Sequence, residues 1–440
     1  MTQPLSACQQ AAMSVLEAPV NAFVTGSAGS GKSFLIRRFL ADKDPKEYPV
    51  LASTGAAAIL VGGRTFHSFF GLGIMQGGLE QTVERAARNK RLVKRIQKAR
   101  AVIVDEISML SGITLRAAER VARLARGKQS PWGGLRVIAV GDFAQLPPVS
   151  QYGTGNAKDW AFLDQSWQIS CFAPAVLKTI VRTQEAPFLE ILNFVREGRF
   201  NERVREFLQE RAGSLPEDDG ATRLFPHRET TERFNLERLS RLAGETRAFP
   251  TEYFGEERFV LDLKRNAPVP EQLQLKEKAL VMIRQNDPAG RWVNGSLGHI
   301  VTIEDERLLI ALLSGRVIEL EKAAFTLMNA DGAEVASAKN FPVNLAYAST
   351  IHKAQGMTLD RVVVDLSKLW EPGHAYVALS RVRTSEGLHV AAWTPSSIKA
   401  DPNVAEFNRA LWESEAYVHG VSPAPRAQLT YQFDDPVSMY

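Results

Sequence analysis

A cluster of glycine, lysine and serine near the start of the chain has the composition and spacing of a phosphate-binding loop. Four residues separate Gly26 from Gly31-Lys32-Ser33. Glycines let successive backbone N–H groups point at phosphate oxygens, while the lysine neutralises the outer phosphates and the serine hydroxyl binds Mg²⁺. A glycine-rich turn without a ligand is the alternative, but an apolar strand pattern before the loop and a helix pattern after it favour the phosphate loop. The predicted loop contacts are Gly26, Ser27, Ala28, Gly29, Ser30, Gly31, Lys32 and Ser33.

Two acids and a glutamine follow later apolar segments. Asp105 and Glu106 end the run 101–104, and Gln145 follows the run 135–140. In a phosphate-loop enzyme such an aspartate holds Mg²⁺ through water and the neighbouring glutamate polarises the attacking water. A glutamine delivered beside the nucleotide suits a γ-phosphate sensor. An ordinary strand end carrying two acids is the alternative. We predict Lys32, Glu106 and Gln145 as catalytic residues, and Ser33 with Asp105 as the metal site.

An arginine near the C-terminal end has unusual neighbours. Most isolated helix arginines lie at the surface, but Arg381 follows the small and apolar run 377–380. This setting predicts a rigid, partly buried guanidinium. Such a group can stabilise charge that builds on a γ-phosphate.

Polar and aromatic residues alternate between positions 54 and 70. Thr54, Thr65, His67 and Ser68 could hydrogen-bond phosphates, and the phenylalanines at 66, 69 and 70 could stack on bases. The alternative is that the phenylalanines form core and His67 is structural. Upstream, Gln9 lies in a helix that Ser6 could cap, and its amide could read an adenine edge. A solvent-facing glutamine is the alternative there.

The elements that must position these residues are apolar strands alternating with helices, which predicts parallel sheets with a ligand at the strands' carboxyl ends. Around residues 279–320 the pattern changes to four short strands, with a tight turn at Ser314-Gly315. We interpret this part as a small β-barrel inserted in an α/β domain, whose pattern resumes at Asn344.

The composition of the 440 residues is that of a globular protein with a formal net charge of +4. That charge tolerates a polyanion without arguing for one. The two cysteines, Cys8 and Cys171, cannot form a disulfide framework or a cysteine-based metal site. No apolar run reaches membrane-spanning length, so no membrane partner is expected. Residues 421–440 are predicted to be a flexible tail.

Taken in order, six motifs resemble the superfamily 1B DNA helicases, most closely the PIF-one (petite integration frequency) family. The resemblance runs from about Leu5 to Trp393; Dda-type phage helicases and RecD-like helicases match less well. With no large N-terminal extension, the chain resembles a bare helicase core of bacterial or phage type. The motifs are Gly26-Ser-Ala-Gly-Ser-Gly-Lys-Ser33, Ala52-Ser-Thr-Gly55 with Thr65-Phe-His-Ser68, Asp105-Glu-Ile-Ser-Met109, Gly141-Asp-Phe-Ala-Gln-Leu-Pro-Pro148, Thr350-Ile-His-Lys-Ala-Gln-Gly356 and Tyr376-Val-Ala-Leu-Ser-Arg381.

The resemblance implies an α/β fold of two RecA-like domains with ATP between them. The first would span residues 1–165, with a short wedge near 71–90. The second would comprise 166–255 and 344–415, interrupted by an SH3-like insert at 256–343.

The resemblance also implies residue roles. Gln9 would read adenine, Gly356 would join the nucleotide-binding residues, and Arg182 with Arg381 would reach the phosphates from the second domain. Those implied to contact the DNA backbone are Thr54, His67, Thr350, His352 and Lys353.

The implied activity is an ATP- and Mg²⁺-dependent helicase that moves 5′-to-3′ on single-stranded DNA and unwinds duplex or structured DNA, G-quadruplexes included. Repair, recombination and telomere maintenance are the implied processes. The partners would be single-stranded and forked DNA, met by a monomer that could self-associate on DNA, in bacterial or phage-infected cytoplasm or in a eukaryotic nucleus or mitochondrion. A phosphate-loop ATPase that switches DNA binding without unwinding is the alternative.

Overall fold

The computed structural model of the chain describes residues 4–53, 64–73, 75, 78–148, 158–213, 221–287, 291–292, 294–328 and 334–418. It divides into a large unit, residues 1–401, and a second unit whose described part is helix α15 (Pro402–Val418). Among the described helices, none combines the length and the apolar character that crossing a membrane requires.

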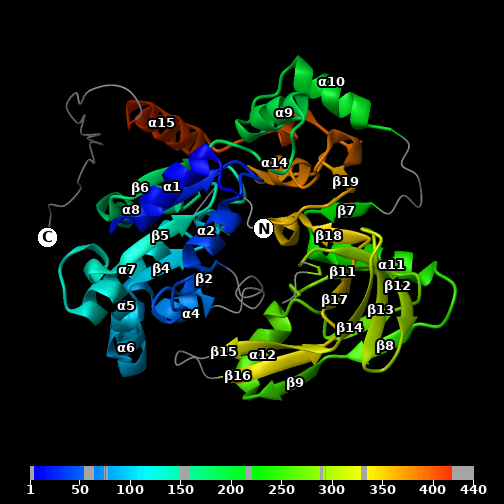
Figure 1. The fold of residues 1–440 in the computed structure, drawn as a ribbon, viewed down its shortest axis with the longest axis horizontal. Coiled ribbons are helices and arrows are strands. Elements are labelled where there is room, and N and C mark those ends of the chain that lie inside the picture. Colours follow the sequence, from blue (N-terminus) through cyan, green and yellow to red (C-terminus); the bar gives the residue numbers. More distant parts are fainter. Residues whose placement is uncertain are drawn as a thin grey trace, which may run out of the picture. The chain divides into compact units, whose positions relative to one another are not determined.

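The first half of the large unit is built on a six-stranded, all-parallel sheet with the strand order β3-β2-β4-β5-β1-β6 (Figure 1, blue to green). Its apolar strands are buried, as both-face coverage by helices requires. The register pairs Val24 with Val140 and Val104 with Ala139, which brings the loops after three strands to one edge. The strands are β1 (Ala22–Gly26), β2 (Val50–Ala52), β3 (Arg64–Thr65), β4 (Ala101–Val104), β5 (Arg136–Val140) and β6 (Ala173–Leu177).

Helices of this half begin where the sequence supplies caps. Ser6 caps α1 (Ala7–Glu17) with a capping box, Thr65 caps α4 (Phe66–Phe70) and Ser111 caps α7 (Gly112–Arg126). The remaining described helices of four or more residues are α2 (Lys32–Leu40), α5 (Gly78–Arg88), α6 (Lys90–Lys98) and α8 (Gln165–Ser170).

The phenylalanines of α4 lie in the core. Phe66, Phe69 and Phe70 are at most 1% exposed, and the Phe66 and Phe70 ring centroids are 4.9 Å apart. The interpretation that these rings stack on DNA bases is therefore wrong, and the core alternative is confirmed. A stacked base needs an accessible ring face, which close packing in the interior removes.

The second half contains a four-stranded parallel sheet with the order β18-β7-β19-β20. Its strands come from two stretches of chain: β7 (Thr222–Phe225) precedes the insert, and β18 (Ala348–Thr350), β19 (Val362–Asp365) and β20 (Leu388–Ala392) follow it. The helices of this half are α9 (Ala186–Arg196), α10 (Glu202–Arg211), α11 (Arg228–Ser240), α13 (Ile351–Ala354) and α14 (His374–Leu379).

An antiparallel insert separates β7 from β18, as the change in sequence pattern predicts (Figure 1, green to yellow). Its largest sheet has the order β14-β13-β12-β11-β17, formed by β11 (Leu280–Ile283), β12 (Leu297–Ile303), β13 (Arg307–Leu312), β14 (Val317–Glu321) and β17 (Val343–Leu345). The turn before β14 places Gly315 at φ +88°, the left-handed region that favours glycine. Smaller sheets pair β8 (Arg247–Pro250) with β10 (Gln272–Leu275), and β9 (Glu252–Gly255) and β15 (Ala323–Met328) with β16 (Glu334–Asn340); α12 spans Glu257–Asn266.

The strand pairing moves two of the predicted domain boundaries. Strand β6 pairs with β1, so the first sheet extends to Leu177 and the boundary at 165/166 is too early. In the part of the chain that the structure describes, β8 pairs with β10 and β9 pairs with β16, so the insert begins near Arg247 and not at residue 256. Both errors have one cause, since strand partners distant in sequence are not visible in a local pattern. The predicted fold class, two parallel α/β regions with an antiparallel insert, is confirmed.

Candidate nucleotide-binding and catalytic site

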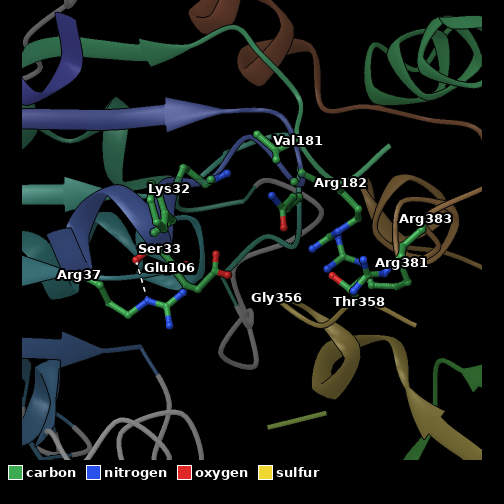
Figure 2. A pocket seen from close by; sticks show the side chains of 15 residues that line it. Lys32, Ser33, Arg37, Glu106, Val181, Arg182, Gly356, Thr358, Arg381 and Arg383 are labelled. Carbon is green, nitrogen blue, oxygen red and sulfur yellow. Dashed lines mark hydrogen bonds between the residues drawn. The ribbon is translucent and has the colours of Figure 1, made fainter. Parts of the chain in front are cut away.

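A cavity of about 350 Å³ lies against the phosphate loop and is lined from both α/β regions. Figure 2 shows Lys32, Ser33 and Glu106 on one side of it and Arg182, Arg381 and Arg383 on the other. Ten of the lining residues were predicted from the sequence: Ala28, Gly29, Gly31, Lys32, Ser33, Glu106, Gln145, Arg182, Gly356 and Arg381. Five were not predicted as site residues: Phe34, Arg37, Val181, Thr358 and Arg383.

The backbone of the phosphate loop requires glycine at the predicted positions. Gly29 and Gly31 have φ values of +81° and +88°, which side-chain-bearing residues rarely adopt. A Cβ at Gly29 would lie 2.4 Å from the Cβ of Arg182. The glycine thus permits the close approach of an arginine that lines the same cavity.

The Lys32 ammonium lies inside the loop. Its Nζ donates to the carbonyl oxygens of Gly26, at 2.8 Å, and Ser27, at 3.3 Å. Burial lowers the pKa of Lys32, while the negative charges of Asp142 and Glu106 oppose that shift. A half-buried lysine that is held by neutral carbonyls and lines the cavity is well placed to exchange them for phosphate oxygens.

Gln9 lies against the same loop. It is 5% exposed, and its Oε1 accepts from the Ser6 N–H at 3.1 Å in the capping box of α1. A Cβ at Gly31 would lie 2.7 Å from the Gln9 Nε2, so the amide nitrogen faces the loop. The solvent-facing alternative for Gln9 is therefore wrong, and its adenine-reading role stays a prediction.

The predicted acids stand together where β4 ends. Glu106 adopts the left-handed conformation (φ 52°, ψ 49°), and its N–H donates to the Asp105 Oδ1 at 3.0 Å. Burial, reinforced by the Asp105 charge, raises the pKa of Glu106 to about 7. A carboxylate whose pKa lies near neutrality is suited to take a proton from water in the transition state.

A residue that sequence reasoning missed contacts this acid. The Gln355 Nε2 donates to the Glu106 Oε2 at 2.9 Å, across 249 positions of sequence. Gln355 stands inside the quoted Thr350–Gly356 motif, but nothing in its type or spacing indicates Glu106 as its partner.

Arg381 is more deeply buried than predicted. It is 1% exposed; its Nε donates to the Val377 carbonyl at 2.7 Å and its Nη2 donates to the Ser380 Oγ at 2.7 Å. Its Nη1 lies 3.4 Å from the carbonyl oxygens of Ala354 and Met357. Burial, with the nearby Arg182 charge, lowers the pKa of Arg381 to about 9. These hydrogen bonds join α13 to α14, so packing in the second α/β region depends on this guanidinium.

Arg182 lies on the segment that leaves the first sheet and enters the second α/β region. Its N–H donates to the Gly29 carbonyl at 3.2 Å and its Nη1 donates to the Ser380 carbonyl at 2.6 Å. It therefore connects the phosphate loop to the residue beside Arg381. That Arg182 reaches the phosphates from the second domain stays a prediction.

Two further contacts join the regions at this site. The Tyr376 hydroxyl accepts from the N–H of Ala28 in the phosphate loop at 2.8 Å. The Arg196 Nη2 donates to the Asp142 Oδ1 at 2.8 Å. Although burial alone would raise the pKa of Asp142, Arg196 and Lys32 hold it below its usual value. Tyr376 and Asp142 belong to two of the six motifs, so the sequence did indicate that they are near the site. Arg196 lies in an ordinary helix pattern, which gave no such indication.

The residues predicted to contact DNA fall into three groups. Thr54 lies outside the described residues. The Thr65 and Thr350 hydroxyl oxygens accept from the N–H groups of Ser68 and Lys353 as helix caps. His352 and Lys353 are exposed, and His67 is half-buried. None of the described residues of this set lines the cavity, so contact with DNA stays a prediction for each of them.

The donor set near the cavity fits Mg²⁺. Ser33 lines the cavity and has a hydroxyl, and Asp105 is adjacent to the lining residue Glu106 and has a carboxylate. Oxygen ligands of these kinds are the ones that this hard cation prefers. Within the described part of the chain, no group of three or more His, Cys, Asp or Glu side chains could hold a metal.

Comparison with known proteins places this geometry among helicases. Residues 5–206 match the family model described as PIF1-like helicase, and residues 284–403 match a second helicase model. The ATP-dependent DNA helicase Pif1 of Bdellovibrio bacteriovorus is 50% identical over 403 residues, covering 92% of this chain and 91% of that protein. The Xenopus laevis ATP-dependent DNA helicase PIF1 is 36% identical over 401 residues; the match covers 90% of this chain and 62% of that longer protein.

Solved structures agree. The Bacteroides sp. Pif1 structure in complex with ADP-AlF4 has a TM-score of 0.81 at 29% identity, covering 94% of this chain and 98% of that one. A Bacteroides Pif1 complex with ADP-AlF3 and single-stranded DNA gives a TM-score of 0.67 at the same identity and coverage.

Proposed function

The chain belongs to the PIF1-like helicase family, and from that premise we propose that it hydrolyses ATP to move along single-stranded DNA and to separate DNA strands. The relative with 50% identity is named an ATP-dependent DNA helicase, and a neighbouring structure holds both a nucleotide analogue and single-stranded DNA. The proposed polarity, 5′-to-3′, follows from the family resemblance alone.

One observation carries this proposal: the nucleotide cavity is lined from both α/β regions. Lys32 and Glu106 come from the first region, and Thr358 and Arg381 from the second. Tyr376 and Gln355 add hydrogen bonds between the regions at the same place. A change in the phosphates can then alter how two regions contact each other, which a motor requires. A binding switch would need only the first region.

We assign the chemistry to residues as follows. The loop N–H groups and Lys32 bind the phosphates, while Ser33 and Asp105 would hold Mg²⁺, which neutralises phosphate charge when bound. Glu106 takes the proton of the attacking water, and Gln145 senses the γ-phosphate. Arg182 and Arg381 stabilise the charge that develops on the γ-phosphate in the transition state.

For DNA, we assign Thr54, Thr65, His67, Thr350, His352 and Lys353 to the phosphate backbone. Forked DNA and G-quadruplexes are the proposed substrates, and a monomer that can self-associate on DNA is the proposed active form. Repair and recombination in a bacterial cytoplasm are the proposed setting.

The domain limits follow the strand pairing. We propose that the first RecA-like domain extends to Leu177, that the insert spans 247–345, and that the remainder up to Asp401 forms the second domain.

Single-stranded DNA should strongly stimulate ATP hydrolysis by the wild-type chain. The test is the steady-state ATPase rate with and without a single-stranded oligonucleotide. An ATPase rate that ignores DNA would overturn the proposal, while stimulation without any strand separation would favour the switch alternative.

A further inference from the structure

The amide of Gln355 is held at one end only. Its Nε2 donates to the Glu106 Oε2 at 2.9 Å, whereas its Oε1 is buried and has no hydrogen-bond partner among the described residues. The amide therefore contacts the proposed general base and keeps one acceptor available beside it. A buried acceptor without a partner is costly, so its retention at a reaction site calls for an explanation.

The chain places Gln355 directly after the helix that carries the proposed DNA contacts. Thr350 caps α13 by accepting from the Lys353 N–H at 3.1 Å, and the helix has only four residues. His352 and Lys353 are exposed on it. Gln355 is its C-cap residue, so a bound DNA strand that shifts this short helix would also shift the backbone that carries the amide.

We propose that Gln355 is a positioning residue for ATP hydrolysis, which holds the Glu106 carboxylate in its working orientation and makes that orientation depend on DNA bound at α13. The inference rests on the proposed function, since it names how DNA and hydrolysis are linked at the same site. No part of it requires Gln355 to contact ATP.

Elementary chemistry explains why a single amide matters here. The water oxygen forms a bond to the γ-phosphorus while the bond from that phosphorus to the β,γ-bridging oxygen breaks, and ADP leaves with the electron pair. The water proton passes to Glu106. A hydrogen bond from a neutral donor to a carboxylate is stronger than one between neutral groups, and it fixes the direction of the free lone pairs. Misalignment of a general base by about 1 Å can cost on the order of 10²-fold in rate.

The test compares two substitutions at this position. Gln355→Ala removes the donor, and we expect kcat at saturating single-stranded DNA to fall by about 10-fold to 100-fold. ATP affinity and DNA affinity, measured directly by titration, should be retained. Gln355→Glu keeps the shape but places a carboxyl group against Glu106, where it either repels that carboxylate or shares a proton with it. We expect Gln355→Glu to be slower than Gln355→Ala, whereas a merely structural glutamine would tolerate the isosteric glutamate better than alanine.

A double-mutant cycle isolates the pair. In a Glu106→Gln background, Gln355→Ala should cause little further loss of kcat, because the carboxylate that it positions is already gone. Gln209→Ala, at an exposed glutamine of α10 in the same α/β region, is the matched control and should match wild type.

The outcomes separate this inference from the function it rests on. Normal kcat in Gln355→Ala, full additivity with Glu106→Gln, or a faster Gln355→Glu than Gln355→Ala would each overturn the inference while leaving a DNA-stimulated wild type intact. A wild type whose ATPase ignores DNA would overturn the proposed function instead.

Discussion

Two largely buried arginines near the nucleotide cavity differ in what balances their positive charge. Arg196 forms an ion pair with the Asp142 carboxylate at 2.8 Å, which raises the pKa of the guanidinium even though burial opposes this. The described hydrogen bonds of Arg381 go to three carbonyl oxygens and one hydroxyl, and burial lowers its pKa to about 9. Buried charges are normally paired. The Arg196 charge is therefore neutralised within the chain, whereas the described hydrogen bonds of Arg381 include no carboxylate, and we propose that an incoming phosphate neutralises its charge.

The two α/β regions also differ in how they position the side chains that line the cavity. In the first region, the side chains proposed to be catalytic follow the ends of parallel strands, and glycines shape the phosphate loop. In the second region, packing around α13 and α14 holds the corresponding groups. Substitutions at the site residues of the first region should therefore lower ATP hydrolysis without lowering stability. Substitutions at those of the second region should lower both.

Lys32→Ala should have the largest effect. The Lys32 ammonium is the positive charge that the phosphate loop offers to the ATP phosphates. Without it, we expect ATP hydrolysis and DNA unwinding to fall below detection, while the melting temperature stays close to wild type. Steady-state ATPase and thermal unfolding measure the two. Lys43→Ala, at a lysine paired with Asp42 beyond the loop helix α2, is the control. Turnover by Lys32→Ala would remove the phosphate loop from the mechanism.

Glu106→Gln should lower kcat by about 10³-fold with ATP affinity retained, because an amide cannot accept the water's proton while the loop stays intact. ATP titration and single-turnover hydrolysis measure affinity and rate separately. Equal loss of both would mean that Glu106 acts in nucleotide binding and not as the base.

Arg381→Lys should lower DNA-stimulated kcat by about 10²-fold, because a lysine cannot replace the planar fork. It should also lower the melting temperature, since the guanidinium bonds to α13 and α14 are lost. Arg199→Lys, at an exposed arginine paired with Glu197, controls for the substitution itself. A destabilised variant with normal kcat would make Arg381 as structural as Arg196.

Lys353→Ala should have the smallest effect. Each phosphate contact contributes about 0.9 to the slope of log affinity against log salt, so the slope should flatten by roughly one. Fluorescence anisotropy with single-stranded DNA at several salt concentrations measures it, with Lys128→Ala, an exposed lysine after α7, as the control. An unchanged slope would place Lys353 away from the DNA backbone.

The parts of the fold and site that the sequence predicted share a physical property: their signals are local. The phosphate loop, the acids at 105–106 and the turn at Gly315 each depend on residues within a few positions. The errors involve distant partners. Neither the pairing of β6 with β1 nor the contact of Gln355 with Glu106 leaves a trace in the residues nearby.

The phenylalanines of α4 were ambiguous for a related reason. A phenylalanine gives the same sequence pattern whether its ring packs in a core or stacks on a base. Only its contacts in the folded chain distinguish the two. Arg381 shows the reverse case. Its apolar sequence neighbours did indicate burial, but not that its guanidinium would bond to carbonyl oxygens more than twenty residues upstream.

Strand separation of tailed duplexes tests the central claim, ATP-driven unwinding of DNA, most directly. A duplex with only a 5′ single-stranded tail, one with only a 3′ tail and one with blunt ends are each incubated with the wild-type chain and ATP, with Lys32→Ala as the reference without turnover. Release of the displaced strand from the 5′-tailed duplex alone, lost in Lys32→Ala, is the expected result. Efficient unwinding from the 3′ tail, or no unwinding of any substrate by a chain whose ATPase responds to DNA, would contradict it.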